Sequence, residues 1–382
     1  MLNGKSKNNN GITLVGLVVT IILLLILTTI SIQSLTNTGL FAKAQEAKEK
    51  TRNAEENQAR TLNEYEDELN KYISGNIKTP IKKVADNIGK VLSTTDNTEL
   101  QDAYGNKIVV PAGFKIVSDD TTNNAQTVDK GIVIEDTTTK ATAGSQFVWI
   151  PVGTIYTDLE HTESKKKIIE LNRYTFDPDG TPTPQDEKII SVSTNINFQE
   201  LETSNKGNTV AKSITNFKTS VIRNGGYYIG RYEARQKNGK LTENKTDVVQ
   251  YNIKQPDAAI QARSMYQDST TFTSDLMNSY AWDTAILFLQ TYGTNNKYSR
   301  QSSLNTNSLA NTGTTDDIQC NVYDIASNLF ELTTETSNEY GRYFVIRGGS
   351  YWGNSVYSSS RNNESSSSNS SWDGFRPILY IN

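Results

Sequence analysis

The longest hydrophobic run of the chain lies near its start, where residues 12–32 are apolar or small and none of the twenty-one carries a charge. At a rise of about 1.5 Å per residue, such a helix spans about 30 Å, the thickness of the hydrocarbon core of a bilayer. Lys5 and Lys7 precede the run, so the positive-inside rule keeps the N-terminus cytoplasmic and exports the remainder. The pattern predicts a transmembrane helix over 12–32. The alternative is a cleaved secretory signal, whose apolar core is usually shorter and is followed by a small-residue cleavage site.

A second periodic pattern predicts a stalk helix over 33–75. Its apolar or small positions are spaced alternately by three and four residues, close to the 3.5-residue period of a coiled coil. Charged residues surround these positions, so a solvated single helix and a self-associating coiled coil both remain open. Gly75 and Pro80 end the helix, and residues 76–101 form a linker. The periodic positions are Leu40, Ala44, Ala47, Thr51, Ala54, Gln58, Thr61, Tyr65, Leu69 and Tyr72.

Beyond residue 102 the pattern changes to short β-type runs separated by polar turns, which predicts an α+β domain over 102–382. One segment, 280–289, has helical periodicity and is expected to bury Trp282, Ala285, Ile286 and Leu289. Residues 154–220 are a polar insertion in this domain, with a turn at 177–180. The predicted strands are 107–111, 114–117, 131–134 and 146–152, and an ordered segment is expected again at 225–233.

The amino-acid composition excludes several classes of function, although it says little about the fold. The net charge is −4, the pI is about 5.4, and no Lys/Arg-rich run occurs, so nucleic acid is not expected as a partner. A single cysteine excludes an intramolecular disulfide framework and a cysteine-cluster metal site. A single histidine, His161, excludes multi-histidine metal centres and would have to serve any Ser–His or Cys–His chemistry.

The start of the hydrophobic run resembles the N-terminus of type IV prepilins. Gly11 and Ile12 stand where the family is cut by its peptidase, after a short polar leader that here comprises residues 1–11. The resemblance implies cleavage between these two residues, and prepilin peptidase and a pilus-type assembly machinery as partners. The family usually has a glutamate five residues after the cut, where this chain has Gly16.

The domain resembles the formylglycine-generating-enzyme (sulfatase-modifying factor) superfamily, which implies a variant of the C-type lectin fold. The resemblance covers residues 102–382. It rests on short motifs in the family's order, namely FVWIPVG at 147–153, YIGRYE at 228–233, NVYDIASNLFELT at 321–333, VIRGGSY at 345–351 and GFRP at 374–377.

The resemblance also implies that the domain is not an enzyme. Active members place two copper-binding cysteines shortly after the Arg-Gly-Gly-Ser motif, and those positions fall on Gly353 and Ser358. Neither residue offers the soft sulfur ligand that copper(I) needs. The single cysteine, Cys320, is expected to be a small buried side chain and His161 a surface residue. For Asn328 and Glu331 two roles remain open, calcium binding and stabilisation of the core. We expect no other metal and no cofactor.

Residues 350–373, the Ser/Asn segment, contain eleven Ser, four Asn, two Tyr and two Trp. Tyr, Trp, Ser and Asn dominate antibody binding loops, because aromatic rings give contact area while Ser and Asn give adaptable hydrogen bonds. The segment also resembles the variable region of proteins diversified by retroelements. A disordered low-complexity loop is the alternative. The expected ligand-binding residues are Tyr351, Trp352, Asn354, Ser355, Tyr357, Ser358, Ser359, Asn362, Asn363, Asn369 and Trp372.

Together these patterns predict a bacterial protein at the cell membrane or in a pilus, with an extracellular, catalytically inactive, lectin-like head that binds a protein or glycan. Two alternatives remain, a structural minor pilin without a ligand and a thiol oxidase of the formylglycine-generating type. Copper content and thiol-dependent oxygen uptake would distinguish the second.

Overall fold

The computed structural model describes residues 18–26, positions 48, 50, 51, 54 and 58, and most of 81–382. Within this last range the gaps are 118–126, 139, 186–187, 192–195, 204–208, 238–239, 244, 246–247, 306–307, 340–341, 354 and 366. The chain divides into two compact units, Met1–Ile77 and Lys78–Asn382. The second unit is α+β and rich in strands, as predicted.

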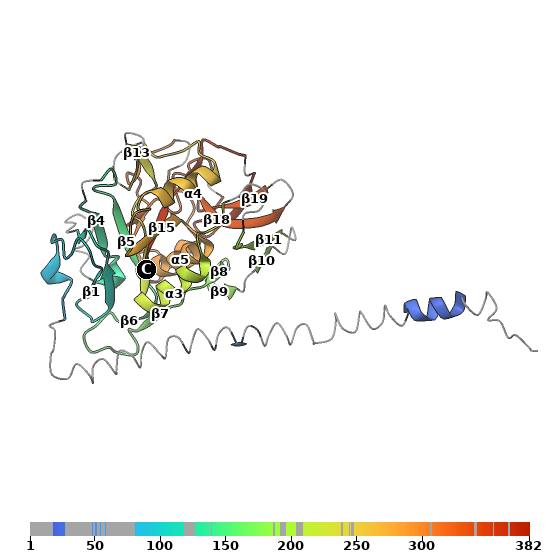
Figure 1. Cartoon of the computed structure of the whole chain (residues 1–382), viewed down its shortest axis with the longest axis horizontal. Coiled ribbons are helices and arrows are strands. Elements are labelled where there is room, and N and C mark those ends of the chain that lie inside the picture. Colours follow the sequence, from blue (N-terminus) through green and yellow to red (C-terminus); the bar gives the residue numbers. More distant parts are fainter. Residues whose placement is uncertain are drawn as a thin grey trace, which may run out of the picture. The chain divides into compact units, whose positions relative to one another are not determined.

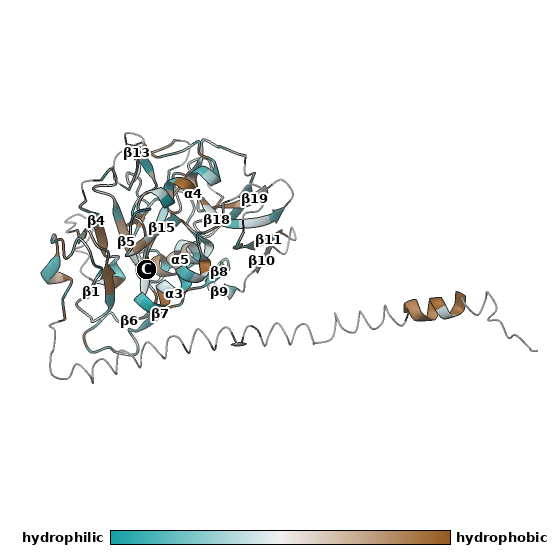
Figure 2. Ribbon diagram, in the orientation of Figure 1, coloured by the Kyte–Doolittle hydropathy of each residue, from teal (hydrophilic) through white to brown (hydrophobic). Residues whose placement is uncertain are grey.

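In the first unit, residues 18–26 are helical, and the large apolar side chains among them are between 46% and 60% exposed. Figure 2 shows this segment as strongly hydrophobic. In the described part of the chain, no helix reaches the length and apolar character needed to cross a bilayer. Gly11, Ile12, the remainder of 12–32, and nearly all of the predicted stalk lie outside the described residues.

The core of the second unit is built on a six-stranded antiparallel sheet in the order β15-β22-β12-β5-β4-β3, of which Figure 1 labels β15, β5 and β4. The C-terminal strand β22 lies between β15 and β12, so the end of the chain is an internal strand of the sheet. The sequence predicted three of these strands, β3, β4 and β5, because their apolar runs are flanked by turn residues, and β12 lies in the segment that was expected to be ordered. The bounds are β3 Phe114–Ile116, β4 Val133–Asp136, β5 Gln146–Pro151, β12 Gly226–Gly230, β15 Phe272–Leu276 and β22 Pro377–Ile381.

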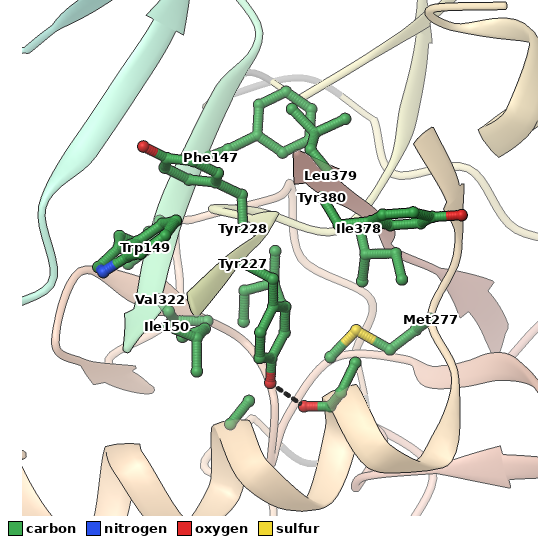
Figure 3. Close-up of a cluster of buried hydrophobic side chains, with 14 of the residues drawn as sticks. Phe147, Trp149, Ile150, Tyr227, Tyr228, Met277, Val322, Ile378, Leu379 and Tyr380 are labelled. Carbon is green, nitrogen blue, oxygen red and sulfur yellow. Dashed lines mark hydrogen bonds between the residues drawn. The ribbon is translucent and has the colours of Figure 1, made fainter. Parts of the chain in front are cut away.

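Large aromatic residues fill the core beside this sheet, as Figure 3 shows. The rings of Trp149 and Tyr228 pack edge to face with centroids 4.9 Å apart. The Tyr227 hydroxyl donates a hydrogen bond of 2.5 Å to the carbonyl oxygen of Ala281 in the neighbouring helix. Buried tyrosines of this kind stabilise a core only when the hydroxyl has a partner, and here it ties sheet to helix.

That helix, α5 (Ser279–Tyr292), contains the predicted segment 280–289. Its N-cap is Asn278, whose side chain accepts a hydrogen bond of 2.9 Å from the Ala281 amide. All four residues expected on its buried face are buried. Two further helices, α3 (Ile214–Asn224) and α4 (Gln255–Ser264), were not predicted; α4 carries few apolar residues, whereas α3 has apolar residues at helical spacing and overlaps the end of the predicted insertion.

A second sheet has the order β10-β11-β18-β19-β20, with β21 paired parallel to β18. It joins the predicted insertion to the C-terminal motifs, because β10 and β11 belong to the insertion and β18 to β21 follow residue 329. The bounds are β10 Lys188–Ser191, β11 Ile196–Gln199, β18 Phe330–Glu339, β19 Arg342–Arg347, β20 Arg361–Glu364 and β21 Asp373–Phe375.

The insertion 154–220 contributes to the folded unit despite its polar composition. Ile169 and Arg173 are buried, and β8 packs against α5. The predicted turn at 177–180 is confirmed by a 2.9 Å hydrogen bond from the Gly180 amide to the Asp177 carbonyl. The remaining elements are η1 Ala85–Asn87, β1 Thr98–Gln101, β2 Lys107–Val110, η2 Val128–Lys130, β6 Gly153–Ile155, β7 Lys167–Ile169, β8 Arg173–Phe176, β9 Pro182–Gln185, β13 Arg235–Lys237, β14 Lys240–Thr242, η3 Tyr298–Arg300, β16 Ile318–Gln319 and β17 Val322–Tyr323.

Candidate functional site

The Ser/Asn segment leaves the core at the end of β19 through the turn Gly348-Gly349. Gly348 has φ +79°, which favours glycine. A Cβ atom on Gly348 would collide with the carbonyl oxygen of Ile325, and one on Gly349 with that of Ala326. The Arg-Gly-Gly-Ser motif is therefore a tight turn against a neighbouring loop.

The most exposed aromatic group of the segment is Trp352, which is 68% exposed. Its ring lies against that of Trp372, with centroids 5.0 Å apart and planes inclined by 31°. Trp372 is half-buried and packs on the main hydrophobic core. The two ends of the segment thus meet in one aromatic pair, in which Trp372 is the base and Trp352 faces solvent. We call it the indole pair.

Tyr351 fixes the backbone beside the indole pair. Its amide donates a 2.8 Å hydrogen bond to the carbonyl oxygen of Asn328, in the loop that precedes β18. Its hydroxyl lies 3.4 Å from the carbonyl oxygen of Ser371. The first contact is strong and the second lies at the outer limit of a hydrogen bond, so the hydroxyl remains able to contact a ligand.

The middle of the segment is anchored to the loop after α5, and this corrects one predicted ligand residue. Ser358 is completely buried, and its hydroxyl donates a 2.5 Å hydrogen bond to the carbonyl oxygen of Tyr298. Its own carbonyl oxygen accepts a 3.0 Å bond from the Trp282 indole. The prediction that Ser358 contacts a ligand is therefore wrong. The polar side chain of Ser358 suggested a position at the surface, but its hydroxyl group is the hydrogen-bond donor to a buried carbonyl oxygen.

Two neighbours of Ser358 have mixed roles. The Ser359 hydroxyl donates a 2.7 Å hydrogen bond to the carbonyl oxygen of Ser299, so this side chain also holds the segment in place. The guanidinium of Arg300 lies 3.9 Å from the centre of the Tyr357 ring, a cation–π contact that covers one face of the tyrosine. Both residues are half-buried, and we regard them as the edge of the candidate surface.

The remaining predicted residues are distributed between strand and surface. Asn362 and Asn363 lie in β20, opposite Ile346 and Val345 of β19, and are half-buried. Ser355 and Asn369 are exposed. Asn354 lies outside the described residues. The structure therefore brings Trp352, Trp372 and Tyr351 together, while Asn362 and Asn363 take part in a sheet.

A buried ion cluster holds the segment at its centre, and sequence reasoning missed it. Arg361, the first residue of β20, forms an ion pair with Asp283 of α5 and donates a 2.9 Å bond from Nε to Glu335 of β18. Arg347 contacts the same two carboxylates at 2.6 and 3.2 Å. Arg173 of the insertion pairs with Glu335. Five residues far apart in the sequence thus converge on one site.

Ion pairing of three guanidinium groups with two carboxylates explains why this cluster tolerates burial. Burial alone would raise the pKa of Glu335, but the three guanidinium groups outweigh it and hold that pKa well below its ordinary range. Burial likewise opposes the charge of Arg361, and Asp283 and Glu335 together raise its pKa instead. A buried charge is costly unless it is paired and hydrogen-bonded, so removal of one member would leave the others uncompensated.

The carboxyl group of Asp373 differs from those in the cluster. Asp373 follows Trp372 directly, is 1% exposed, and neither carboxyl oxygen has a hydrogen-bond partner in the described part of the chain. Burial, and after it the negative charge of Glu364, raises the pKa of Asp373 to about 7. The Asp373 carboxyl therefore changes its charge near neutral pH.

Asn328 and Glu331, for which calcium binding and a core role were both open, make core contacts. Asn328 has φ +64° and donates a 2.5 Å hydrogen bond to Glu233. Glu331 pairs with Arg376 at 2.6 Å. Over the described ranges, no group of three or more His, Cys, Asp and Glu side chains is arranged to hold a metal ion.

Cys320 and His161, the two remaining side chains that could take part in catalysis, both make structural contacts. Burial, followed by the charge of Asp129, raises the pKa of Cys320 to about 12, so its thiol is protonated at physiological pH. His161 is exposed, as expected, and its ring stacks on Tyr156 with centroids 3.9 Å apart. Its Nε2 atom lies 2.7 Å from the carbonyl oxygen of Tyr104, so the ring braces a loop.

Comparison with known proteins gives no family assignment. No protein-family model matches the chain, and no curated protein matches it. Three solved structures have some similarity to it: CarF (13% identity, TM-score 0.31, covering 41% of this chain and 87% of that one), PvdO from Pseudomonas aeruginosa (12%, 0.32, 63% and 95%), and Treponema denticola variable protein 1 (14%, 0.28, 63% and 98%). At these TM-scores the similarity carries no argument about fold or function.

Proposed function

We propose that this protein is a surface-displayed binding protein, in which the second unit is a catalytically inactive, lectin-like head. The fold variant is that of the formylglycine-generating superfamily, as the sequence motifs imply. The head contacts an extracellular ligand through the indole pair and the exposed residues around it. Its partners for assembly are prepilin peptidase and a pilus-type machinery, and its location is the cell membrane or a pilus.

The observation that carries this proposal is the contrast within the Ser/Asn segment. Its ends and centre are held by the core through Trp372, Ser358 and Arg361, yet Trp352 is 68% exposed. Large apolar side chains held rigidly at a surface are the anchors of binding interfaces, where Trp and Tyr dominate the energy. A disordered low-complexity loop would not have these anchors.

The exposed apolar helix at residues 18–26 supports membrane anchorage, because apolar side chains on all faces of a helix have no stable place in water. Under this proposal, cleavage after Gly11 leaves Ile12 as the mature N-terminus. Mass spectrometry of envelope protein tests this, and an intact Met1 or a cut beyond Ser31 would contradict it.

The side chains at the cysteine positions of the family support an inactive head. Gly353 has no side chain, and the Ser358 hydroxyl is bonded to a buried carbonyl. The thiol oxidase alternative predicts stoichiometric copper and thiol-dependent oxygen uptake by the purified protein, and we expect neither. The structural minor pilin alternative predicts that the protein is the bulk component of sheared filaments.

The binding function is tested with the full chain carrying Trp352→Ala. We expect the variant to lose binding to whole cells or envelope fractions while it keeps the wild-type thermal midpoint. Leu159→Ala is the matched control, because Leu159 is 72% exposed and lies outside the Ser/Asn segment. Unchanged binding by the Trp352 variant would contradict the proposal.

A further inference from the structure

The chemistry around the indole pair indicates what kind of ligand it accepts. Of the four tryptophans, Trp149 and Trp282 are fully buried and Trp372 is half-buried, so Trp352 presents a free aromatic face as no other does. The amide of Trp352 lies 3.3 Å from the Ser350 hydroxyl, and its ring rests on Trp372. The exposed face is thus held in place before a ligand arrives, which lowers the entropy cost of binding.

The segment that carries this face is almost uncharged. Between residues 348 and 372 the charged side chains are Arg361 and Glu364. Arg361 is engaged in the buried ion cluster, and Asp373 beyond it is 1% exposed. Glu364 is half-buried, and the other groups of the segment that reach solvent are aromatic rings, hydroxyls and amides. A polyanion would need unpaired basic side chains, whereas a cation could stack on the Trp352 ring but would leave the neutral hydroxyls and amides around it unused.

We infer that the indole pair binds a hexopyranose ring of a neutral glycan. The apolar C–H face of the sugar stacks on Trp352, while its hydroxyl groups exchange hydrogen bonds with the Tyr351 hydroxyl and the exposed Ser371. Such a ligand matches both properties of the surface, since a pyranose has an apolar face and a periphery of neutral donors and acceptors. The inference rests on the proposed function and names the ligand class of the same surface.

The test uses the full chain in a detergent without a sugar headgroup, because a glycoside detergent would compete. The probes are arrayed neutral oligosaccharides of glucose, galactose, mannose and N-acetylhexosamine, printed beside sulfated and sialylated counterparts. Each bound neutral glycan is then titrated in solution against intrinsic tryptophan fluorescence. We expect saturable binding of at least one neutral glycan.

Variants of Trp352 test whether this binding depends on the indole pair. Trp352→Ala should weaken it about tenfold or more at an unchanged thermal midpoint. Trp352→Phe, which keeps an aromatic face, should retain most of the affinity, and Leu159→Ala should retain all of it.

Binding of charged glycans alone, of no glycan, or of neutral glycans with equal affinity by the Trp352→Ala variant would overturn the inference. The whole-cell assay separates this failure from failure of the proposed function. If binding to cells depends on Trp352 while no neutral glycan binds, the ligand is not a neutral glycan but the display function stands. If neither assay detects binding that depends on Trp352, both fail.

Discussion

Replacement of Asp373 by asparagine should leave the stability of the protein unchanged below about pH 4 and should stabilise it increasingly as the pH rises from 4 towards 7. The two side chains have nearly the same shape, but asparagine never ionises. The Asp373 carboxyl is 1% exposed and lacks a hydrogen-bond partner among the described residues, so its charged form has no compensation in the fold.

The size of the effect follows from proton linkage. The ordinary pKa of this carboxyl is 3.8, and burial followed by the charge of Glu364 raises it to about 7 in the folded protein. Between these values the unfolded chain has released the proton while the folded protein keeps it, so stability falls as the pH rises. At about 1.4 kcal/mol per pH unit, the loss between pH 4 and pH 8 is on the order of 4 kcal/mol. Water that reaches the carboxylate would reduce it, so this value is an upper limit.

The assay is urea denaturation of the full chain, followed by tryptophan fluorescence at pH 5, 6, 7 and 8. Burial also raises the pKa of Glu200 to about 7 and that of Asp317 to about 6, so the wild type has further pH-dependent terms. The difference between Asp373→Asn and wild type removes these shared terms. It should be about 1.5 kcal/mol in favour of the variant at pH 5 and should grow to about 4 kcal/mol at pH 8.

Asp268→Asn is the matched control, because the Asp268 side chain is 76% exposed and its removal should give a difference that does not vary with pH. A gain for Asp373→Asn of equal size at pH 5 and pH 8 would refute the reasoning, as would a loss at pH 8. Either result would mean that the carboxylate is ionised in the folded protein and stabilised by a partner.

Three further predictions concern the anchors and the thiol. Arg361→Met should lower the free energy of unfolding by about 3–5 kcal/mol, because Asp283 and Glu335 lose a buried partner. A loss below about 1 kcal/mol in urea denaturation would show that the cluster is hydrated. Ser358→Ala should lower the free energy of unfolding by about 1 kcal/mol, whereas Ser355→Ala, at an exposed position, should change it by no more than about 0.5 kcal/mol. Neither variant should change ligand binding. Equal melting temperatures for the two variants would contradict the buried hydrogen bond of Ser358. Burial, followed by the charge of Asp129, raises the pKa of the half-buried Cys320 thiol to about 12, so this thiol should react with iodoacetamide at pH 8 more slowly in folded than in urea-unfolded protein; equal labelling rates would contradict the raised pKa.

Local elements of the head were predictable where the apolar pattern was dense. The helix containing Trp282 and the strand containing Trp149 combine clear periodicity with turn residues at their ends, and both are confirmed. Helix α4 was missed because it buries small or polar residues such as Ala258 and Gln255, which contribute little to a hydrophobic pattern. Helix α3 buries Phe217 and Val221 at helical spacing, but it begins inside the segment that was interpreted as a polar insertion. Their stability comes from packing against the sheets, which a local pattern does not record.

The candidate surface was predictable in composition and not in detail. Richness in Trp, Tyr, Ser and Asn identified the segment, but Trp352 and Trp372 were expected to act alike, and only the fold makes one the base of the other. Ser358 could not be separated from Ser355 by sequence, because a serine is equally suited to water and to a buried carbonyl. Asp373 gave no signal, since its importance depends on the absence of partners in the described surroundings.

The sequence by itself determined the α+β class, the apolar N-terminal run, the turn at Gly348 and the segment richest in binding-type residues, because these depend on residue type and on spacing over a few positions. Tertiary structure decided which side chains of that segment face solvent. Arg173, Asp283, Glu335, Arg347 and Arg361 come from five places along the chain, and burial makes their attraction strong enough to fix the segment. A charge in water interacts weakly with its partners, so only the fold, by excluding water, turns these scattered residues into one anchor.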